Sequence, residues 1–289
     1  MNRMANLKEI RNRISSVSST MQITSAMKMV SAAKLKKAQD AITAMRPYAN
    51  KLTELLQSLS ASLDDDAGST YAENREVNKV LVVAVPSNRG LCGAFNSNIL
   101  KQCTLLVNDT YAGKQVDFLA VGKKANDGLA KKSNVIGNKS EVFDNLTFEA
   151  VSEIAEELMA KFTEGDYDRI ELVYNKFKNA ATQIVMTEQF LPIAPTQGDD
   201  QNSGDYIFEP EKAEIVEQLI PKSLKTQLYK AIRDSFASEH GARMTAMHKA
   251  TDNATALRDQ LKLTYNKARQ AAITNEILEI VGGAEAVNN

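Results

Sequence analysis

Hydrophobic residues recur at alternating steps of three and four along the first sixty residues of the chain. The repeat begins at Leu7 and includes Ile10, Ile14, Val17, Met21, Leu35, Ala38, Ile42, Met45, Ala49, Leu52, Leu56, Leu59 and Leu63. A seven-residue hydrophobic repeat is typical of a helix that lies along another helix in a left-handed coiled coil. The pattern therefore predicts one long helix over residues 1–63.

Two features interrupt this repeat. Pro47 lacks a backbone N–H, so we expect a kink about one turn upstream of it. Nearer the N-terminus the repeat becomes polar at Thr24, Lys28 and Ser31, while Met27 and Val30 lie beside it. This stretch is therefore not expected to face a single apolar partner.

Turn-forming glycines are nearly absent from both ends of the chain. Residues 1–67 contain none, and residues 205–281 contain Gly241 alone. A second long helix is therefore predicted in the C-terminal segment, residues 211–289. At the usual rise per residue the first helix would reach roughly 90 Å, and the second, counted from Glu211 to Gly282, roughly 105 Å. Because the middle segment joins the end of the first helix to the start of the second, we expect them to be antiparallel. Residues near Met21 should then lie against the C-terminal half of the second helix.

The periodicity changes between the helices. An acidic linker (64–78) precedes an apolar, β-branched run at 79–85 that is typical of a buried parallel strand. Further strands are predicted at 116–121, 169–176 and 183–190, and helices up to about Tyr111, at 124–131 and at 148–162. This alternation favours a three-layer α/β domain over 79–195, followed by a loop at 196–210. The predicted fold mixes α+β and α/β features, with a long antiparallel coiled coil of the terminal helices and a central Rossmann-like α/β domain.

Composition places the 289-residue chain, with 43% hydrophobic and 25% charged residues, among globular proteins. No apolar run approaches the 18 or so residues of a membrane span. Helical patterning begins almost at once, whether the chain starts at Met1 or Met4, which leaves no room for a signal or transit peptide. We therefore expect a prokaryotic cytoplasmic chain.

The net charge of −1 conceals an uneven distribution. Residues 1–63 carry a net charge of +7, residues 64–210 carry −9, and residues 211–289 carry +1, with a basic stretch at 240–275. A solvated helix face explains most such charge runs. An acidic partner surface is the second interpretation, and nucleic acid is disfavoured because aromatic interleaving and a basic pI are missing.

Candidate chemistry is sparse. The loop from Gly90 to Gly93 follows a predicted strand, but neither the six-residue glycine spacing of a P-loop nor G-x-G-x-x-G occurs. We interpret these glycines as a tight strand-to-helix turn, with nucleotide binding as the lesser alternative. Cys92 and Cys103 are too few for a disulfide framework, and with two histidines no zinc site can be assembled. The sequence thus predicts no catalytic residue, metal or cofactor.

Several short motifs occur in a characteristic order. They are Ile23-Thr-Ser-Ala-Met-Lys-Met-Val30 with Ala33-Lys34, Arg89-Gly-Leu-Cys-Gly93 with Asn96, Arg243-Met244 with Ala246-Met247, Ala250-Thr-Asp-Asn253, and Ile273-Thr-Asn-Glu276 with Glu279 and Gly283-Ala284. With these motifs the chain resembles the gamma-subunit family of F-type ATP synthases over essentially its whole length. Asn88 stands where many members have Asp. The loop at 196–210 has no cysteine pair, so the redox switching of chloroplast relatives is not implied.

The resemblance implies a rotor. The paired terminal helices would form the central stalk inside a ring of three alpha and three beta subunits, and the α/β domain would dock on the epsilon subunit and the membrane-embedded c-ring. Rotation would couple ion flow to ATP synthesis or hydrolysis. The chain would be a non-catalytic, peripheral component at the cytoplasmic face of a prokaryotic cell membrane, without nucleic-acid partners.

The resemblance also implies which residues meet the stator. Met27, with Lys28 beside it, resembles the residue that faces the acidic lever of the beta subunit. Arg243, Arg269, Gln270 and Thr274 resemble shaft residues that hydrogen-bond to stator loops, and Glu276 is a further candidate. Spacing alone would make Met27 a coiled-coil packing residue, and Arg269 and Gln270 part of a solvated face. Two other functions stay open on the residues: a coiled-coil scaffold that self-associates, and a nucleotide-dependent enzyme.

Overall fold

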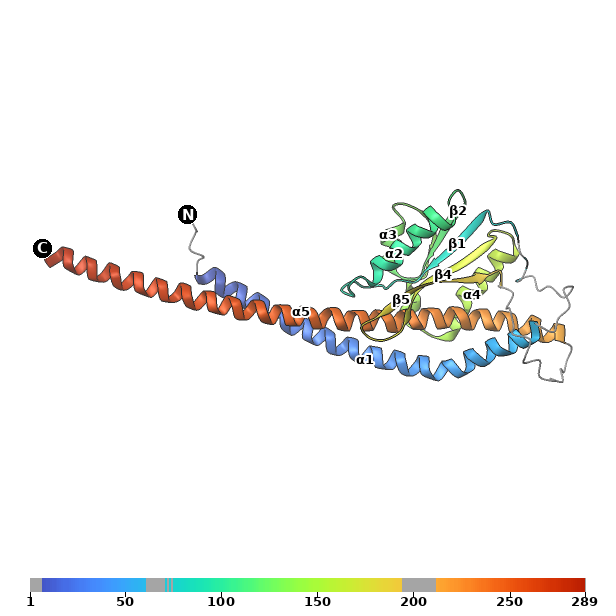
Figure 1. The fold of residues 1–289 in the computed structure, drawn as a ribbon, viewed down its shortest axis with the longest axis horizontal. Helices are drawn as coiled ribbons and strands as arrows, with labels where there is room; N and C mark the ends of the chain where they lie inside the picture. The colour runs from blue at the N-terminus through green and yellow to red at the C-terminus, as the bar shows by residue number, and fades with distance from the viewer. Residues whose placement is uncertain (1–6, 61–70, 72, 74, 194–211, 289) are drawn as a thin grey trace. The chain divides into compact units, whose positions relative to one another are not determined.

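The computed structural model describes residues 7–60, 71, 73, 75–193 and 212–288. Both predicted long helices are present, as α1 (Leu7–Ser60) and α5 (Lys212–Asn288) (Figure 1). The chain divides into two compact units. One contains residues 7–30 and 244–288, and the other contains the described residues from 31 to 243. Each long helix therefore contributes to both units.

The predicted seam of α1 is buried in the larger unit. Leu35, Ala38, Ile42, Ala49 and Leu52 have between 1% and 7% of their surface exposed. The helix continues through Pro47, and α5 continues through Pro221, so neither proline ends its helix. The side chains of Leu56, Leu59 and Leu63 lie outside the described part of the chain, as do most of the predicted linker (64–78) and all of the predicted loop (196–210).

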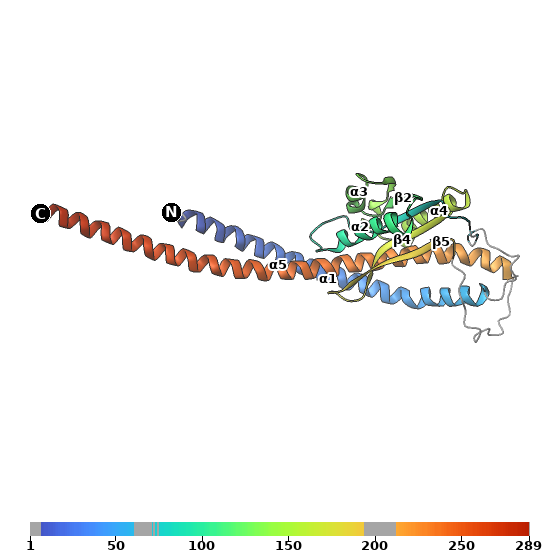
Figure 2. The same cartoon turned by 45° about the horizontal axis from the view of Figure 1, so that its top comes forward.

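A five-stranded sheet forms the centre of the larger unit, in the order β3-β2-β1-β4-β5. Figure 2 labels β2, β4 and β5 of this sheet. The strands are β1 (Lys79–Ala84), β2 (Gln115–Ala120), β3 (Asn134–Asn138), β4 (Arg169–Phe177) and β5 (Gln183–Leu191). The first four are mutually parallel, and β5 pairs antiparallel with β4. The strands predicted from the sequence are confirmed, and β3, which was not predicted, adds an edge strand beside β2.

Helices cover both faces of the sheet, which confirms the three-layer α/β architecture. On one face α2 (Phe95–Leu105) and α3 (Lys123–Leu129) pack on even-numbered residues of β1, such as Val80 and Val82. On the other face α4 (Phe148–Thr163) and the first part of α5 pack on Leu81 and Val83. Burial on both faces explains why β1 is a continuous apolar run rather than an alternating one.

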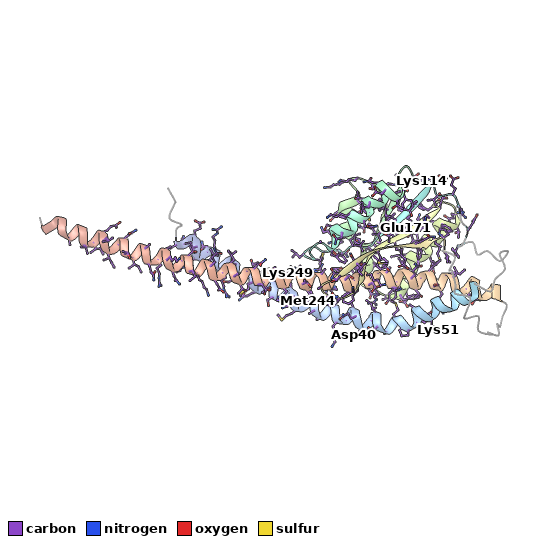
Figure 3. All side chains as sticks on the ribbon, viewed as in Figure 1. Asp40, Lys51, Lys114, Glu171, Met244 and Lys249 are labelled. Atoms are coloured by element: carbon purple, nitrogen blue, oxygen red, sulfur yellow. The ribbon has the colours of Figure 1, made fainter. Side chains whose placement is uncertain are left out.

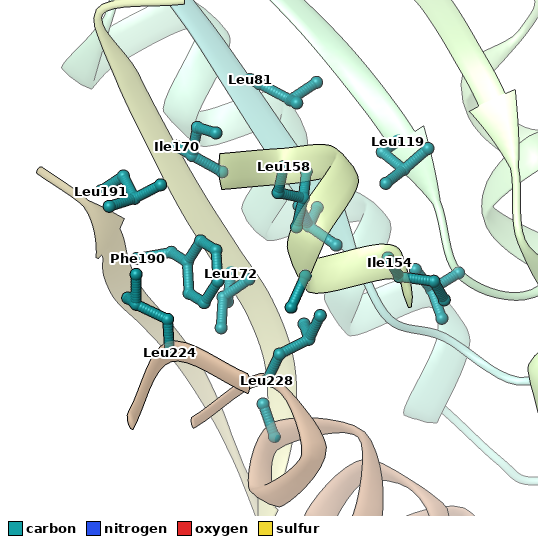
Figure 4. Close-up of a cluster of buried hydrophobic side chains, with 14 of the residues drawn as sticks. Leu81, Leu119, Ile154, Leu158, Ile170, Leu172, Phe190, Leu191, Leu224 and Leu228 are labelled. Carbon is teal, nitrogen blue, oxygen red and sulfur yellow. The ribbon is translucent and has the colours of Figure 1, made fainter. Parts of the chain in front are cut away.

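The face that holds α5 has the larger core. Figure 4 shows Leu158 of α4 among Leu81, Ile170 and Leu172 of the sheet, with Leu224 and Leu228 of α5 at its margin. The predicted stripe of α4 is confirmed, because Ile154, Leu158 and Phe162 are all buried. Thr147 caps the helix by accepting a hydrogen bond of 3.3 Å from the Ala150 N–H. The core therefore includes α5 as a structural helix of the α/β domain.

Candidate functional site: the paired ends of the long helices

The smaller unit is an antiparallel pair of helices, as predicted. The Arg11 guanidinium donates a 2.7 Å hydrogen bond to the Tyr265 hydroxyl, while Thr251 donates one of 2.8 Å to Thr24. Between these points Thr255 Oγ1 lies 3.3 Å from the sulfur of Met21. As the residue number rises along α1 it falls along α5, so Met21 faces the C-terminal half of α5 as expected.

The seam of this pair has few large apolar side chains in its middle. Thr24, Met247 and Ala254 are buried there, with 9%, 4% and 8% of their surface exposed. Large apolar side chains instead point away from the seam: Ile23, Met29, Val30, Leu257 and Leu263 are between 46% and 65% exposed. The middle of the seam thus buries small and polar groups beside Met247, and several large apolar side chains of the pair are exposed.

The end of α5 continues past the point where α1 begins (Figures 1 and 2). Every side chain from Arg269 to Ala284 is exposed. The set includes Ile273, Ile277, Leu278, Ile280 and Val281, at 48% to 65% exposure. At 100° per residue these side chains lie within about 160° of the helix circumference, on one face. Figure 3 shows side chains projecting from α5. No described residue of the chain covers them, and an exposed apolar helix face of this kind is typical of a surface that a partner covers.

Four predicted stator-contact residues lie on this exposed end: Arg269, Gln270, Thr274 and Glu276. The Thr274 hydroxyl donates a 3.0 Å hydrogen bond to the carbonyl of Gln270, which leaves the Gln270 side-chain amide available to a partner. Met27 and Lys28 lie on α1 and are half-buried. Arg243 differs from all of these, because only 7% of its surface is exposed and its polar contacts are with residues of the larger unit.

Metal sites, membrane spans and reactive thiols each require features that the described residues lack. They contain no group of three or more side chains suited to holding a metal ion, and none of their helices is long and apolar enough to cross a membrane. Cys92 and Cys103 are free thiols, both buried, and burial raises the pKa of Cys103 to about 12. Neither thiol is therefore a reactive nucleophile at neutral pH.

Exposed apolar side chains at the end of a helix pair are typical of a subunit of a larger assembly. The family model for ATP synthase matches residues 6–287. ATP synthase gamma chains from Flavobacterium psychrophilum and Flavobacterium johnsoniae are 75% and 74% identical, covering 98% and 99% of this chain and 99% and 100% of theirs. The chain belongs to the ATP synthase gamma-chain family.

Solved structures agree with this assignment. A chain in the central stalk and c-ring of Tetrahymena thermophila mitochondrial ATP synthase is 27% identical, with a TM-score of 0.58 over 79% of this chain and 99% of that one. A chain of the Euglena gracilis mitochondrial ATP synthase in its third rotational state has a TM-score of 0.70 over 97% of this chain and 94% of its own. At 24% identity, the second likeness supports the fold alone.

Proposed function

We propose that the paired ends of α1 and α5 turn inside the alpha–beta ring and that the α/β domain connects them to the c-ring and the epsilon subunit. As a member of its family, this chain is the central-stalk rotor subunit of an F-type ATP synthase. The observation that supports this use of the helix ends is the uncovered apolar surface of α5 between Ile273 and Val281. Complete burial of a fully exposed side chain of this size gains about 1.5–3 kcal/mol, so these half-exposed side chains would each gain roughly half of that from a partner.

In this role the chain has no catalytic residue of its own. It is held at the cytoplasmic face of the cell membrane as a peripheral part of the complex. Met27, Lys28, Arg269, Gln270, Thr274 and Glu276 are the proposed contacts with the alpha and beta subunits. The described residues that support this are exposed or half-buried on the helix pair, where a surrounding ring can reach them.

Native mass spectrometry of the tagged chain tests the proposal. Expressed with alpha and beta subunits, it should be recovered with three copies of each, and this complex should hydrolyse ATP. Recovery as a stable homo-oligomer that ignores alpha and beta subunits would instead support a scaffold. Binding of ATP by the isolated chain would support an enzyme.

Replacing both Gln270 and Thr274 with alanine tests the directional contacts at the end of α5. A neutral polar group can act on the stator only through hydrogen bonds, each worth about 0.5–1.5 kcal/mol net. We expect lower ATP turnover by the assembled complex at unchanged helical content, because alanine is the better helix former. Rotation assays and circular dichroism measure the two quantities.

The chain supplies a matched control pair, Gln260 and Thr264. These residues have the same spacing, are exposed, and show the same 3.0 Å bond from the threonine hydroxyl to the glutamine carbonyl. Alanine at both should leave turnover nearly unchanged. If the two double variants lose equal amounts of ATP turnover, Gln270 and Thr274 have no specific contact with the stator. The same conclusion follows if the Gln270 and Thr274 variant loses helical content.

Neutralising four lysines of α1 tests the interpretation that its basic stretch meets an acidic partner. Lys28 is half-buried, and Lys34, Lys36 and Lys37 are exposed. Exposed ion pairs contribute about 0.2–1 kcal/mol each, so glutamine at all four should weaken assembly by about 1–4 kcal/mol. Raised salt should reproduce part of this loss in the wild type.

The control changes the same number of charges elsewhere. Lys114, Lys123, Lys131 and Lys132 are exposed on the α/β domain and become glutamine in the control. Titration of assembly at low and high ionic strength compares the two variants. If the α1 variant assembles as tightly as the control, the lysines form only a solvated face.

A further inference from the structure

A short stretch of α5, from Ser235 to Arg243, is tied to the sheet by buried polar contacts. The Ser235 hydroxyl donates a 2.7 Å hydrogen bond to the carbonyl of Val85, directly after β1. The Ser238 hydroxyl donates one of 2.9 Å to the carbonyl of Asn175 in β4. Both serines are at most 1% exposed. Two adjacent parallel strands are thus each joined to the helix by a directional bond shielded from water.

Gly241 brings a third segment against the same stretch. A Cβ atom on this residue would lie 3.2 Å from Ala180 Cα and 3.4 Å from the Phe177 ring. The β4–β5 connection therefore packs directly on the backbone of α5, at a distance that leaves no comfortable room for a side chain. This contact explains the single glycine in a segment of otherwise uninterrupted helical pattern.

Arg243 adds the fourth contact. Its Nη1 atom lies 2.6 Å from Glu239 Oε1, and its Nη2 atom donates to the carbonyls of Arg89 and Gly90, both at 3.2 Å. Side-chain exposure is 8% for Arg243 and 9% for Glu239. A buried guanidinium needs its charge and its donors satisfied, and this one meets a carboxylate and the loop after β1 together.

His240 adds no further positive charge beside Arg243. Burial, followed by the charge of Arg243, lowers the pKa of His240 to about 3, so the ring is neutral at physiological pH. Its Nδ1 atom lies 3.4 Å from Arg243 Nη1 and can accept rather than repel. Lys34 and Arg89 are the other cations that act on Glu239.

These contacts surround a large part of the helix. At 100° per residue, Gly241, Ser238, Ser235, Glu239 and Arg243 span about 200° of its circumference. Apolar packing is non-directional, whereas hydrogen bonds with fixed partners depend on angle and so add resistance to rotation of the helix about its own axis. Directional contacts placed around α5 in this way therefore suit a connection that has to resist twisting of the helix, and not only one that stabilises the fold.

We propose that Ser235, Ser238, Glu239, Gly241 and Arg243 form a clamp that transmits torque between the α/β domain and α5, with Arg243 as a positioning residue rather than a stator contact. The inference rests on the proposed function, because torque reaches the chain at the α/β domain and leaves it through the continuous helix beyond Arg243. If these contacts were weakened, part of the applied rotation would twist α5 relative to the α/β domain instead of turning both together.

Torsional stiffness measured on single complexes tests the clamp. The alpha–beta ring is fixed to a surface, a bead is attached to a cysteine at exposed position Lys131, and the angular variance is recorded within one catalytic dwell. Arg243→Lys, and separately Ser235→Ala with Ser238→Ala, should raise that variance at least about twofold, because directional bonds are lost. Unloaded ATP turnover should stay near the wild-type rate, while ATP synthesis by the whole enzyme falls.

Thr226→Val is the matched control. Thr226 is 4% exposed on the same helix, and its hydroxyl donates within the helix, to the Lys222 carbonyl at 2.7 Å. It should leave the variance unchanged. Unchanged variance in the serine variant, with native melting temperature, would overturn the clamp even if Arg243→Lys fails to assemble. Reduced unloaded turnover at unchanged variance would make Arg243 a stator contact and also overturn it. Failure of the wild-type chain to assemble or rotate would instead reject the proposed function.

Discussion

With Thr24 and Thr251 replaced by cysteine and joined as a disulfide, ATP-driven rotation and ion pumping should continue nearly unchanged. A reducible cross-link from Gln270→Cys to a beta subunit should stop both processes until it is cleaved. The first bridge joins two helices that we expect to turn together, and the second joins rotor to stator. Single-molecule rotation assays measure rotation, and ion uptake by vesicles measures pumping.

The structure makes the internal bridge feasible. The hydroxyl oxygens of Thr24 and Thr251 are 2.8 Å apart, so cysteines at these positions need little backbone movement to pair. The native thiols should not interfere, because Cys92 and Cys103 are only 2% and 0% exposed. The reduced double-cysteine variant is the control for the substitutions themselves. If the internal bridge stops rotation in a normally assembled complex, the helices move relative to each other during turnover and the rigid-shaft mechanism is wrong.

Much of the fold could be predicted because its signals are local. The apolar run of β1 and the Ile154, Leu158 and Phe162 stripe of α4 each specify one kind of element through periodicity. Strand β3 has no comparable signal. It is a five-residue edge strand, Asn134–Asn138, in which Val135 and Ile136 are the only large apolar residues. Its pairing with β2 comes from the position of the neighbouring strand rather than from its own pattern.

The candidate site was predictable to a different extent. The candidate residues near the end of α5 were predicted from the resemblance of their motifs to the family. Their contacts with a stator stay a prediction. The clamp was not predicted, since Ser235 and its partner Val85 are 150 residues apart and no local pattern links them. The one available signal was Gly241, which stands alone in a long helical segment. An isolated glycine in a helix often marks close approach of another backbone, and here it does.

A series of three glycine-to-alanine variants should separate steric overlap from backbone strain in the α/β domain. Gly122 follows β2 with a φ of +132, and a Cβ there would lie 2.7 Å from the backbone oxygen of Pro86. Gly113 has a φ of +79 but open space around it, and Gly90 has neither restriction. Each variant is made in the full chain, and its free energy of unfolding is measured by urea titration.

We expect a graded result. Gly90→Ala should be neutral or stabilise by about 0.4–1 kcal/mol, because alanine restricts the unfolded chain. Gly113→Ala should cost about 1–2 kcal/mol for a left-handed backbone. Gly122→Ala should cost about 3 kcal/mol or more, because strain of about 1–3 kcal/mol adds to an overlap that only backbone movement can relieve. Equal losses of unfolding free energy at Gly113 and Gly122 would mean that the backbone at Pro86 moves away from the new Cβ atom at little cost. The steric contribution that the contact between Gly122 and Pro86 predicts would then be absent.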